Sequence, residues 1–428
     1  MHLALHYPLT GLSVFLLAVI GLTVATNDVW PVKYTALGSS PPAPRHRRLG
    51  DWMRNAVGRS LSSASSQSSA MQTTDRNLPY VELRLPGVTR RIFRVMVDTG
   101  VVGVHLNGSA LGRWKIRGLR EQTQAYHSRL LRETRAGGEH FNSLKQQSCP
   151  MRSSVEAWYP RKLQVGDTIY RDVPVYLNGS PKVPVREPNW PAGLDGVIGL
   201  MRSQVDDSPC VACSLIGLFC QGSTHRAVMF NFTDTNPAAH QIRMCLPSDT
   251  LLAEGAQTYP AALTDAAWQT SQSLELSAGT SGKDLQRVGQ GVVLRFNPAL
   301  EAIRMDIPLL GALEAPMGLQ LNPHDYQPAD PTESTFGDLS GIHLQLKWST
   351  PARAQSILLD ETQLVSTPDG QKTKLMWQGR SSGFGYGTEA QAAGKSYTDM
   401  GYPFFLKYVV LLNERAVGAS YIHLLQQR

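Results

Sequence analysis

Short segments in which apolar and polar residues alternate dominate the sequence from residue 78 onward. Such alternation has the period of a β-strand with one buried face, and Gly, Pro, Asn and Asp turn signals separate the segments. The clearest strand candidates lie within residues 80–98, 161–179, 341–348, 356–365 and 404–422. Helical periodicity is scarce, with short candidates at 299–305 and 402–408. The sequence therefore predicts an all-β fold.

The length and charge of the chain narrow its class. Its 428 residues suffice for two to three average domains, or for one large two-lobed β-protein, with a substantial core. The formal net charge is +7, and +3 of this comes from residues 1–48. The remaining +4 is too little, over too many residues, for a nucleic-acid-binding surface. We expect no nucleic-acid partner.

The N-terminus has the pattern of a targeting segment. Residues 9–25 are uncharged and mostly apolar, and Thr23-Val24-Ala25 suits a cleavage site of small residues. We expect residues 1–25 to be a signal peptide, with an uncleaved signal anchor as the alternative and the only expected route to a membrane. Asn-x-Ser/Thr sequons at Asn107, Asn178 and Asn231 agree with glycosylation in the secretory pathway. The expected location is extracellular or the lumen of a vacuole or lysosome.

Residues 26–77 read as a propeptide and linker. A Pro-rich stretch ends in Arg45-His46-Arg47-Arg48, which fits a site for a furin-like convertase; a solvated basic turn is the alternative. Residues 60–74 are polar and of low complexity, so they cannot bury enough surface to order themselves. We expect the folded body to begin at residue 78.

The cysteines predict disulfides and no metal site. In an oxidising compartment the five cysteines would form two disulfides and leave one thiol. Cys210-Val-Ala-Cys213 is the only CxxC pair, and it has no nearby pair of histidines. We therefore expect neither a metal nor a cofactor. The five are Cys149, Cys210, Cys213, Cys220 and Cys245.

Three blocks occur in a recognisable order. They are YVELRLPG…FRVMVDTG, then GLDGVIGL, then MGYPFFLKYVVLLN…VGA. In this order the chain resembles the pepsin-like aspartic peptidases from Tyr80 to Ala419. The resemblance implies a bilobal all-β fold, with an N-terminal lobe at 78–245 and a C-terminal lobe at 246–428. It also implies a monomer with a hairpin flap over a central cleft that binds a peptide or protein.

The resemblance assigns one catalytic acid directly. Asp98 would be the acid of the first lobe, with Thr99 and Gly100 completing its loop. In such a site two neighbouring carboxylates share one proton. The ionised carboxylate takes a proton from water, and the protonated one donates to the substrate carbonyl.

The second acid is harder to place. Asp98 precedes Gly199 by 101 residues, and counting back a similar distance from Gly401 leads to the block at 289–303. Matching that block to the family puts Arg295 at the position of the acid, which is the assignment we favour. Asp360 is a weaker candidate because only 41 residues separate it from Gly401.

Two other positions and the flap complete the comparison. Ser277 lies in LSAGTSG, which imitates the catalytic loop, and Asp306 has no glycine beside it. In the flap region, residues 137–158, no Tyr-Gly pair occurs, and Tyr126 and Phe141 are imperfect substitutes for the flap tyrosine.

The missing acid determines the expected function. An arginine facing Asp98 would keep the carboxylate ionised and could not donate a proton to the substrate. We expect a secreted homologue that is catalytically impaired or inactive and binds peptide or protein in its cleft. One alternative is an active, divergent endopeptidase with an unrecognised second acid. The other is a structural or adhesive glycoprotein without cleft function.

Overall fold

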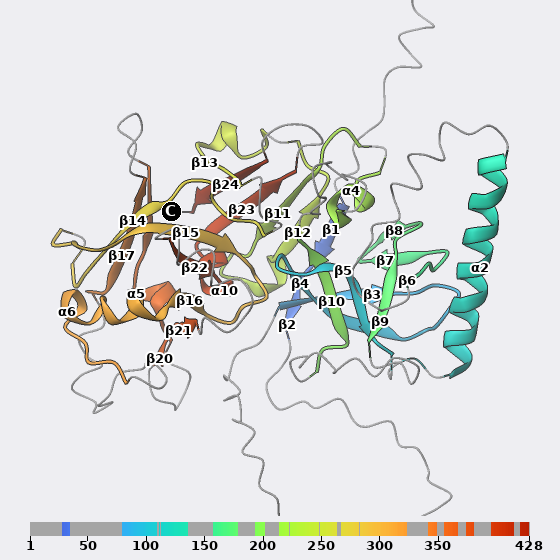
Figure 1. Ribbon diagram of the computed structural model, residues 1–428, viewed down its shortest axis with the longest axis horizontal. Helices are drawn as coiled ribbons and strands as arrows, with labels where there is room; N and C mark the ends of the chain where they lie inside the picture. Colours follow the sequence, from blue (N-terminus) through green and yellow to red (C-terminus); the bar gives the residue numbers. More distant parts are fainter. Residues whose placement is uncertain are drawn as a thin grey trace, which may run out of the picture.

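The structure is a computed structural model in which two lobes lie side by side with a shared sheet between them (Figure 1). It describes residues 28–34, 79–108, 111, 113–135, 157–178, 193–201, 214–221, 223–247, 249–262, 267–281, 283–322, 341–348, 355–366, 374–380, 395–414 and 420–427. The segments expected to be a signal peptide, a processing site and a polar linker lie outside these residues, apart from 28–34.

The N-terminal lobe contains a nine-stranded sheet in the order β6-β9-β5-β10-β4-β3-β7-β8, with β2 paired to β3. In this sheet β4 alternates buried with more exposed residues, as the sequence predicts for a strand with one core face, whereas every residue of β10 is buried. The strands are β2 (Lys33–Tyr34), β3 (Pro79–Arg84), β4 (Ile92–Asp98), β5 (Val102–Asn107), β6 (Ala157–Trp158), β7 (Leu163–Val165), β8 (Thr168–Tyr170), β9 (Val175–Asn178) and β10 (Gly196–Leu200).

The C-terminal lobe contains a seven-stranded sheet in the order β18-β17-β14-β15-β22-β16-β21. Between β18 and β21 along the chain, β19 (Val365–Ser366) and β20 (Lys374–Leu375) form a separate two-stranded sheet. The seven strands are β14 (Leu274–Gly279), β15 (Gln286–Phe296), β16 (Ile303–Asp306), β17 (His343–Trp348), β18 (Ser356–Leu359), β21 (Trp377–Arg380) and β22 (Ser396–Met400).

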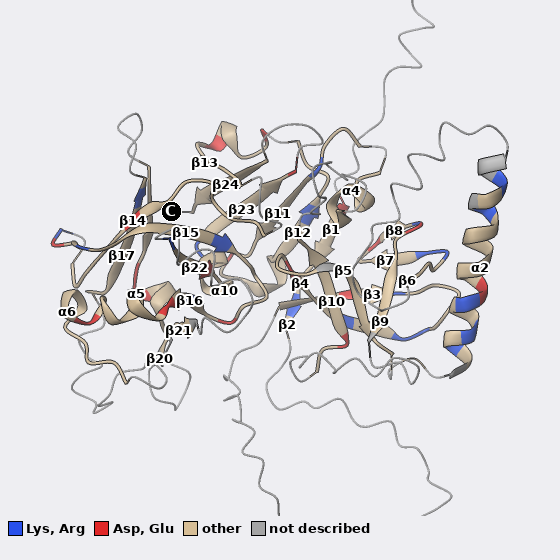
Figure 2. Cartoon of the chain, in the orientation of Figure 1, with Lys and Arg blue, Asp and Glu red and all other residues tan. Residues whose placement is uncertain are grey.

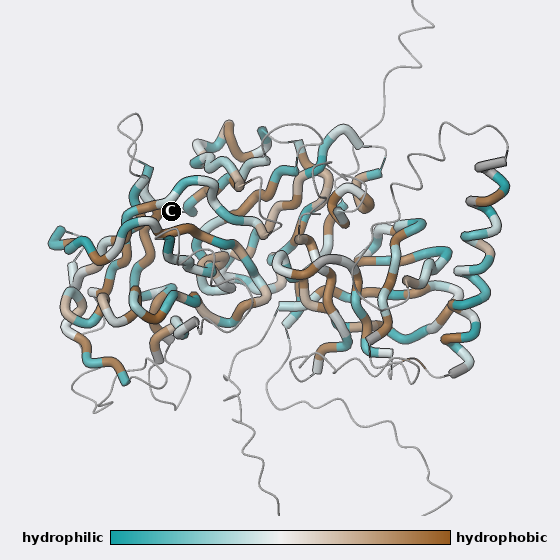
Figure 3. The backbone as a smooth tube through the Cα atoms, viewed as in Figure 1, coloured by the Kyte–Doolittle hydropathy of each residue, from teal (hydrophilic) through white to brown (hydrophobic). Residues whose placement is uncertain are grey.

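A six-stranded sheet joins the two halves of the chain, in the order β1-β12-β11-β23-β24-β13. The hydrophobic core is continuous from one lobe to the other, and hydrophobic stretches occur in the strands of both lobes and of the shared sheet (Figure 3). The joining strands are β1 (Asp28–Pro31), β11 (Ala227–Asn231), β12 (Gln241–Met244), β13 (Gln257–Pro260), β23 (Tyr408–Asn413) and β24 (Tyr421–Gln426). The two-lobed all-β prediction is confirmed, whereas the exact lobe limits stay a prediction because this sheet draws on both halves.

Residues 28–34 belong to the folded body, although the sequence analysis placed them in the propeptide and linker. β1 pairs with β12 of the shared sheet and β2 pairs with β3 of the first lobe. Trp30 is completely buried, and its indole N–H donates to the Tyr170 hydroxyl at 2.9 Å. The alternation of Trp30, Val32 and Tyr34 is the strand signal that the Pro-rich surroundings concealed.

The long helix α2 (Arg113–Arg135) was also not predicted. Apolar or small side chains recur at 116, 119, 123, 126 and 130, which is helical spacing hidden among many charged residues. The other helical segments are short: α4 (Leu215–Phe219), η3 (Pro237–Ala239), η4 (Leu252–Glu254), α5 (Ile307–Gly311), α6 (Glu314–Met317), α8 (Glu361–Leu364) and α10 (Tyr402–Phe405). In the described part of the chain, no helix has the length and hydrophobicity to span a membrane.

One disulfide lies within the described residues. It joins Cys220, which follows α4, to Cys245, which follows β12, across 25 residues of sequence. Both half-cystines are buried in the first lobe's part of the core. The other three cysteines lie outside the described residues, so their pairing stays a prediction.

Candidate active site

The loop that carries Asp98 begins where β4 ends. Val95 and Val97 point into the core, which leaves the Asp98 side chain on the other face of the strand and partly exposed. The Gly100 backbone N–H donates to Asp98 Oδ1 at 2.6 Å and closes a short turn. Thr99 is buried, and its hydroxyl donates to the Phe296 carbonyl oxygen of the second lobe. The loop is therefore anchored across the lobe boundary.

Strand β10 packs tightly against this loop through Gly199. Gly199 pairs with Asp98 in the parallel register of β10 and β4. A Cβ atom on Gly199 would lie 2.2 Å from the Val101 carbonyl oxygen and 3.0 Å from that of Gly103. No side chain fits there, because real Cβ contacts are longer. The glycine therefore lies against the third and fifth residues after the acid.

The second lobe repeats this arrangement around Asn297. Strands β15 and β22 are parallel, and their register pairs Phe296 with Met400. A Cβ atom on the next residue, Gly401, would lie 2.7 Å from the Leu300 carbonyl oxygen and 2.2 Å from that of Ala302. These are the third and fifth residues after Asn297. Asn297 therefore occupies the position in its lobe that Asp98 occupies in the first.

The two loops meet through these side chains. Asn297 Nδ2 donates to Asp98 Oδ1 at 2.8 Å. Asn297 Oδ1 accepts from the Ala299 N–H at 3.0 Å, which matches the Gly100 turn of the first loop. Because the Ala299 N–H can only donate, it fixes the amide with its oxygen toward Ala299 and its nitrogen toward Asp98. The site is a carboxylate–amide pair.

This geometry corrects the assignment of Arg295, which does not face Asp98. β15 continues through Phe296, so Arg295 is a strand residue and the loop starts two residues later than expected. The Arg295 side chain is buried, its Nε donates to Gln269 Oε1 at 2.8 Å, and its guanidinium carbon lies 4.0 Å from the Tyr397 ring centroid. Asn297 precedes Gly401 by 104 residues and Arg295 precedes it by 106, so the count of about 101 favoured neither residue, and the error came from matching the block at 289–303 to the family.

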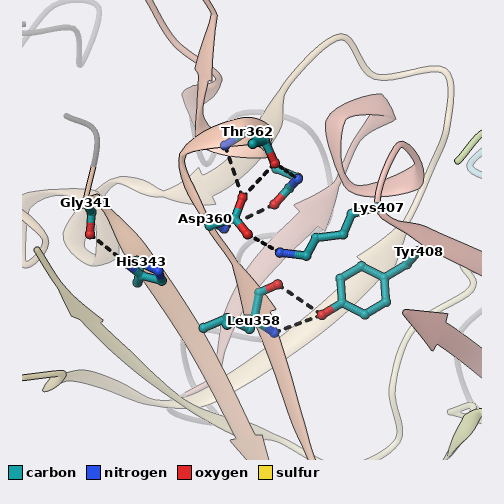
Figure 4. Close-up of polar contacts among 8 residues, drawn as sticks. Gly341, His343, Leu358, Asp360, Thr362, Lys407 and Tyr408 are labelled. Carbon is teal, nitrogen blue, oxygen red and sulfur yellow. Dashed lines mark hydrogen bonds and ion pairs between the residues drawn. The ribbon is translucent and has the colours of Figure 1, made fainter. Parts of the chain in front are cut away.

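Asp360 has a structural role at the start of α8 (Figure 4). Its Oδ1 accepts from the Thr362 N–H at 3.1 Å, and its backbone N–H donates to Gln363 Oε1, which completes a capping box. Its other oxygen pairs with the Lys407 ammonium. Burial alone would raise the pKa of Asp360, but the hydrogen bonds from Lys407 and Thr362 and the charge of Lys407 lower it overall. Both carboxylate oxygens of Asp360 are thus engaged in structural contacts, with Thr362 and with Lys407.

The remaining candidates for a second acid lie in regular structure. Ser277 is a buried residue inside β14, paired with Gln345, so it does not lie in a loop. Asp306 ends β16, and its Oδ2 accepts from the Tyr397 N–H at 2.7 Å. Neither residue is hydrogen-bonded to Asp98. In the part of the chain that the structure describes, no second carboxylate is hydrogen-bonded to Asp98.

The environment of Asp98 favours its protonated form more than water does. Burial is the largest influence and raises the pKa of Asp98. The N–H of Gly100, the amide of Asn297 and the charge of Arg304 act in the opposite direction, but the net pKa stays above the ordinary carboxyl value. The expectation that a neighbouring arginine would hold the carboxylate ionised is therefore wrong in its cause and its direction.

The two loops differ in how they are anchored. The second-loop residue equivalent to Thr99 is Pro298, one position after Asn297. Proline has neither a hydroxyl nor an N–H, so it cannot return the bond that Thr99 makes to Phe296. The first loop therefore donates a hydrogen bond to the second lobe through Thr99, and Pro298 donates none in return.

Two further predictions fall partly outside the described residues. Tyr126 lies on α2 and stacks on Tyr159 with ring centroids 4.1 Å apart, so it is part of the helix packing and not of a flap. Phe141 and residues 136–156 lie outside the described residues. The three sequon asparagines end strands β5, β9 and β11, and their glycosylation stays a prediction.

Comparisons with known proteins support the fold. No known protein family matches the sequence. No curated protein matches it either. Among solved structures, the aspartic proteinase from Irpex lacteus matches with a TM-score of 0.51 at 10% sequence identity, covering 82% of this chain and 94% of that chain.

The fold is thus that of the pepsin-like aspartic proteinases: two β-lobes, with a polar side chain from each meeting at their junction. An identity of 10% shows the fold alone.

Proposed function

We propose that this chain is a catalytically impaired or inactive homologue of the pepsin-like aspartic peptidases that binds peptide or protein segments in the cleft between its lobes. The observation that carries the proposal is the Asn297 amide, which donates to Asp98 Oδ1 at 2.8 Å. A second acid would have to occupy the position that this amide holds.

The chemistry of the pair explains the loss of activity. Peptide hydrolysis by two acids needs one group that takes a proton from water while another gives one to the substrate. An amide does neither, because it does not titrate in the usable pH range. Asp98 could serve in one role and would then leave the other unfilled. Loss of one such group typically reduces the rate by about two to four orders of magnitude.

Binding does not depend on the missing acid. The fold implies a cleft, and Asp98 remains partly exposed at the junction of the lobes. Its carboxyl group and the Asn297 amide can still hydrogen-bond a peptide. Binding without transition-state stabilisation is the behaviour of a peptide-binding protein rather than an enzyme.

The proposed setting is the secretory pathway. Residues 9–25 and the three sequons suggest it, and the Cys220–Cys245 disulfide is typical of oxidising compartments. The chain would act there as a soluble peptide binder if the N-terminal segment is removed.

The test is hydrolysis of a mixed peptide library by purified residues 26–428 from about pH 3 to pH 7, the range in which acid pairs titrate. The native chain is compared with Asp98→Asn, which removes the carboxyl group, and with Asn297→Asp, which restores the second. We expect the native chain and Asp98→Asn to give the same background, and Asn297→Asp to gain hydrolysis at acid pH.

Hydrolysis by the native chain that disappears in Asp98→Asn would overturn the proposal and establish the active endopeptidase. Binding is measured separately, by retention of the same peptides on the immobilised native chain. If no peptide is retained by a chain that circular dichroism shows to be folded, the peptide-binding role is wrong and the adhesive or structural alternative gains support.

A further inference from the structure

Helix α2 stands at the outer edge of the first lobe and carries most of the protein's excess charge (Figure 2). Residues 113–135 contain seven Lys and Arg and two Glu, a net +5 out of +7 for all 428 residues. The positive charge is therefore unevenly distributed along the chain. About one twentieth of the chain concentrates the positive charge on one element.

One face of α2 is fixed to the lobe. Leu119 is completely buried, and the Thr123 hydroxyl accepts from the Tyr159 N–H at 2.9 Å. The Gln122 side chain accepts from the Arg161 N–H at 2.8 Å. These contacts set the rotation of the helix about its axis, so the opposite face must point away from the protein.

The outward face combines basic and apolar side chains with one acidic residue, Glu121. With 3.6 residues per turn, Trp114, Arg117, Leu131 and Arg132 fall within a sector of about 100° on the side opposite Leu119. Trp114 is 82% exposed and Leu131 is 60% exposed, the two highest values among the large hydrophobic residues that the structure describes. They lie near opposite ends of the helix, about 26 Å apart along its axis.

We propose that this face of α2 docks onto the surface of an anionic lipid bilayer. Lys and Arg near a bilayer are attracted to acidic headgroups, and tryptophan favours the boundary between headgroups and acyl chains. A purely charged partner such as a polyanion would leave the exposed Trp114 and Leu131 without a role. A bilayer surface accommodates both kinds of side chain in one plane, with the helix lying along it.

The basic side chains of this face can exchange their acidic partners within the protein for lipid headgroups. On the outward face Arg117 pairs with Glu121 at 3.2 Å, and both of these side chains are mostly exposed. Ion pairs this exposed contribute little free energy, so lipid headgroups can replace the acidic partners at small cost. Docking by α2 is independent of the Asp98–Asn297 site and does not require the proposed function to hold.

The experiment is co-sedimentation of purified residues 26–428 with vesicles. This chain contains every described residue and lacks the apolar segment 9–25, which would itself enter a bilayer. The vesicles are phosphatidylcholine alone or with about one third phosphatidylserine. The test variants are Arg117→Gln with Arg132→Gln, and Trp114→Ser. The control is Lys283→Gln with Arg287→Gln, two exposed bases of the second lobe, one of them also paired to a glutamate.

We expect binding to the anionic vesicles only, weakened by salt. The double variant on α2 should lose about 25-fold in affinity, at about fivefold per charge. Trp114→Ser should also weaken binding, and the control should bind like the native chain.

Equal binding to both vesicle types, or equal binding by the α2 variants and the native chain, would overturn the proposal. Retention on immobilised heparin that depends on Arg117 and Arg132, without vesicle binding, would show that the face binds a polyanion instead and would also overturn it.

Discussion

Restoring a carboxyl group with Asn297→Asp should make the stability of the protein strongly dependent on pH. The native amide nitrogen lies 2.8 Å from Asp98 Oδ1, so the variant brings two carboxyl groups into direct contact. Two unit charges about 4 Å apart repel by about 4 kcal/mol at an effective dielectric constant of about 20. Loss of the hydrogen bond from the amide to a charged acceptor adds about 1.5–3 kcal/mol when both groups are ionised.

The direction with pH follows from where the proton is held. At acid pH one proton shared between the carboxyl groups replaces the amide hydrogen, and the variant should be nearly as stable as the native chain. Burial already raises the pKa of Asp98 in the native fold, and a second carboxylate raises it further. The folded variant therefore binds a proton more firmly than the unfolded chain, and this stabilisation disappears as the pH rises through the folded pKa.

The assay is urea unfolding at about pH 4 and about pH 7.5, comparing the native chain with Asn297→Asp. The free-energy loss caused by the substitution should be about 4–5 kcal/mol larger at the higher pH, because retention of the shared proton, at about 1.36 kcal/mol per pH unit, limits the combined cost of repulsion and the lost hydrogen bond. A matched control is the charge-swapped double variant, Asp98→Asn with Asn297→Asp, which again has one carboxylate and one amide and should recover most of the loss. A loss of equal size at both pH values would refute the reasoning, because it would show that the two side chains do not interact.

Three further outcomes concern stability and are measured by denaturant unfolding. Replacing Cys220 and Cys245 together by Ala should cost about 3.5 kcal/mol, as expected for a closed loop of 25 residues, and a cost below about 1 kcal/mol would contradict this. Trp30→Ala should cost about 3–5 kcal/mol because Trp30 is completely buried, and an unchanged midpoint would show that residues 28–34 are dispensable. The pKa of Asp360 is lowered in the fold, so its contribution is lost as the pH falls through that pKa; Lys407→Met should lower stability at neutral pH and flatten its decline below about pH 4.

The strands and the loop that carries Asp98 could be predicted because they depend on local pattern. Alternation locates β4, and the Asp-Thr-Gly sequence after it identifies the turn that Gly100 closes. Such signals need only a few neighbouring residues. The two-lobed architecture followed from the order of three such blocks along the chain.

The second loop could not be placed because its position depends on contacts far apart in sequence. The decisive feature is the close approach of Gly401 to the Leu300 carbonyl oxygen, across about 100 residues of sequence. Counting residues located only the block at 289–303, and matching the strand within that block to the family selected Arg295, because the sequence does not show that β15 continues through Phe296. A search for the turn itself, in which a side-chain oxygen accepts from the N–H two residues later, would have favoured Asn297.

Helix α2 and residues 28–34 were missed for different reasons. The apolar spacing of α2 is helical, but hydrophilic residues outnumber the apolar ones along the helix (Figure 3). Residues 28–34 alternate as a strand should, yet only the tertiary structure provides their partners, β12 and β3. In both cases the local signal existed, and the surrounding composition outweighed it.

The proline after Asn297 has a consequence for the chemical ageing of the site. An asparagine deamidates to aspartate mainly when the backbone nitrogen of the next residue attacks its side-chain carbonyl and a cyclic imide forms. That nitrogen belongs to Pro298, which carries no hydrogen and is closed to this route. Storage therefore does not convert the carboxylate–amide pair into two acids by the imide route. Any acid proteolysis that develops in an aged preparation should be sought in a contaminant before it is credited to Asn297.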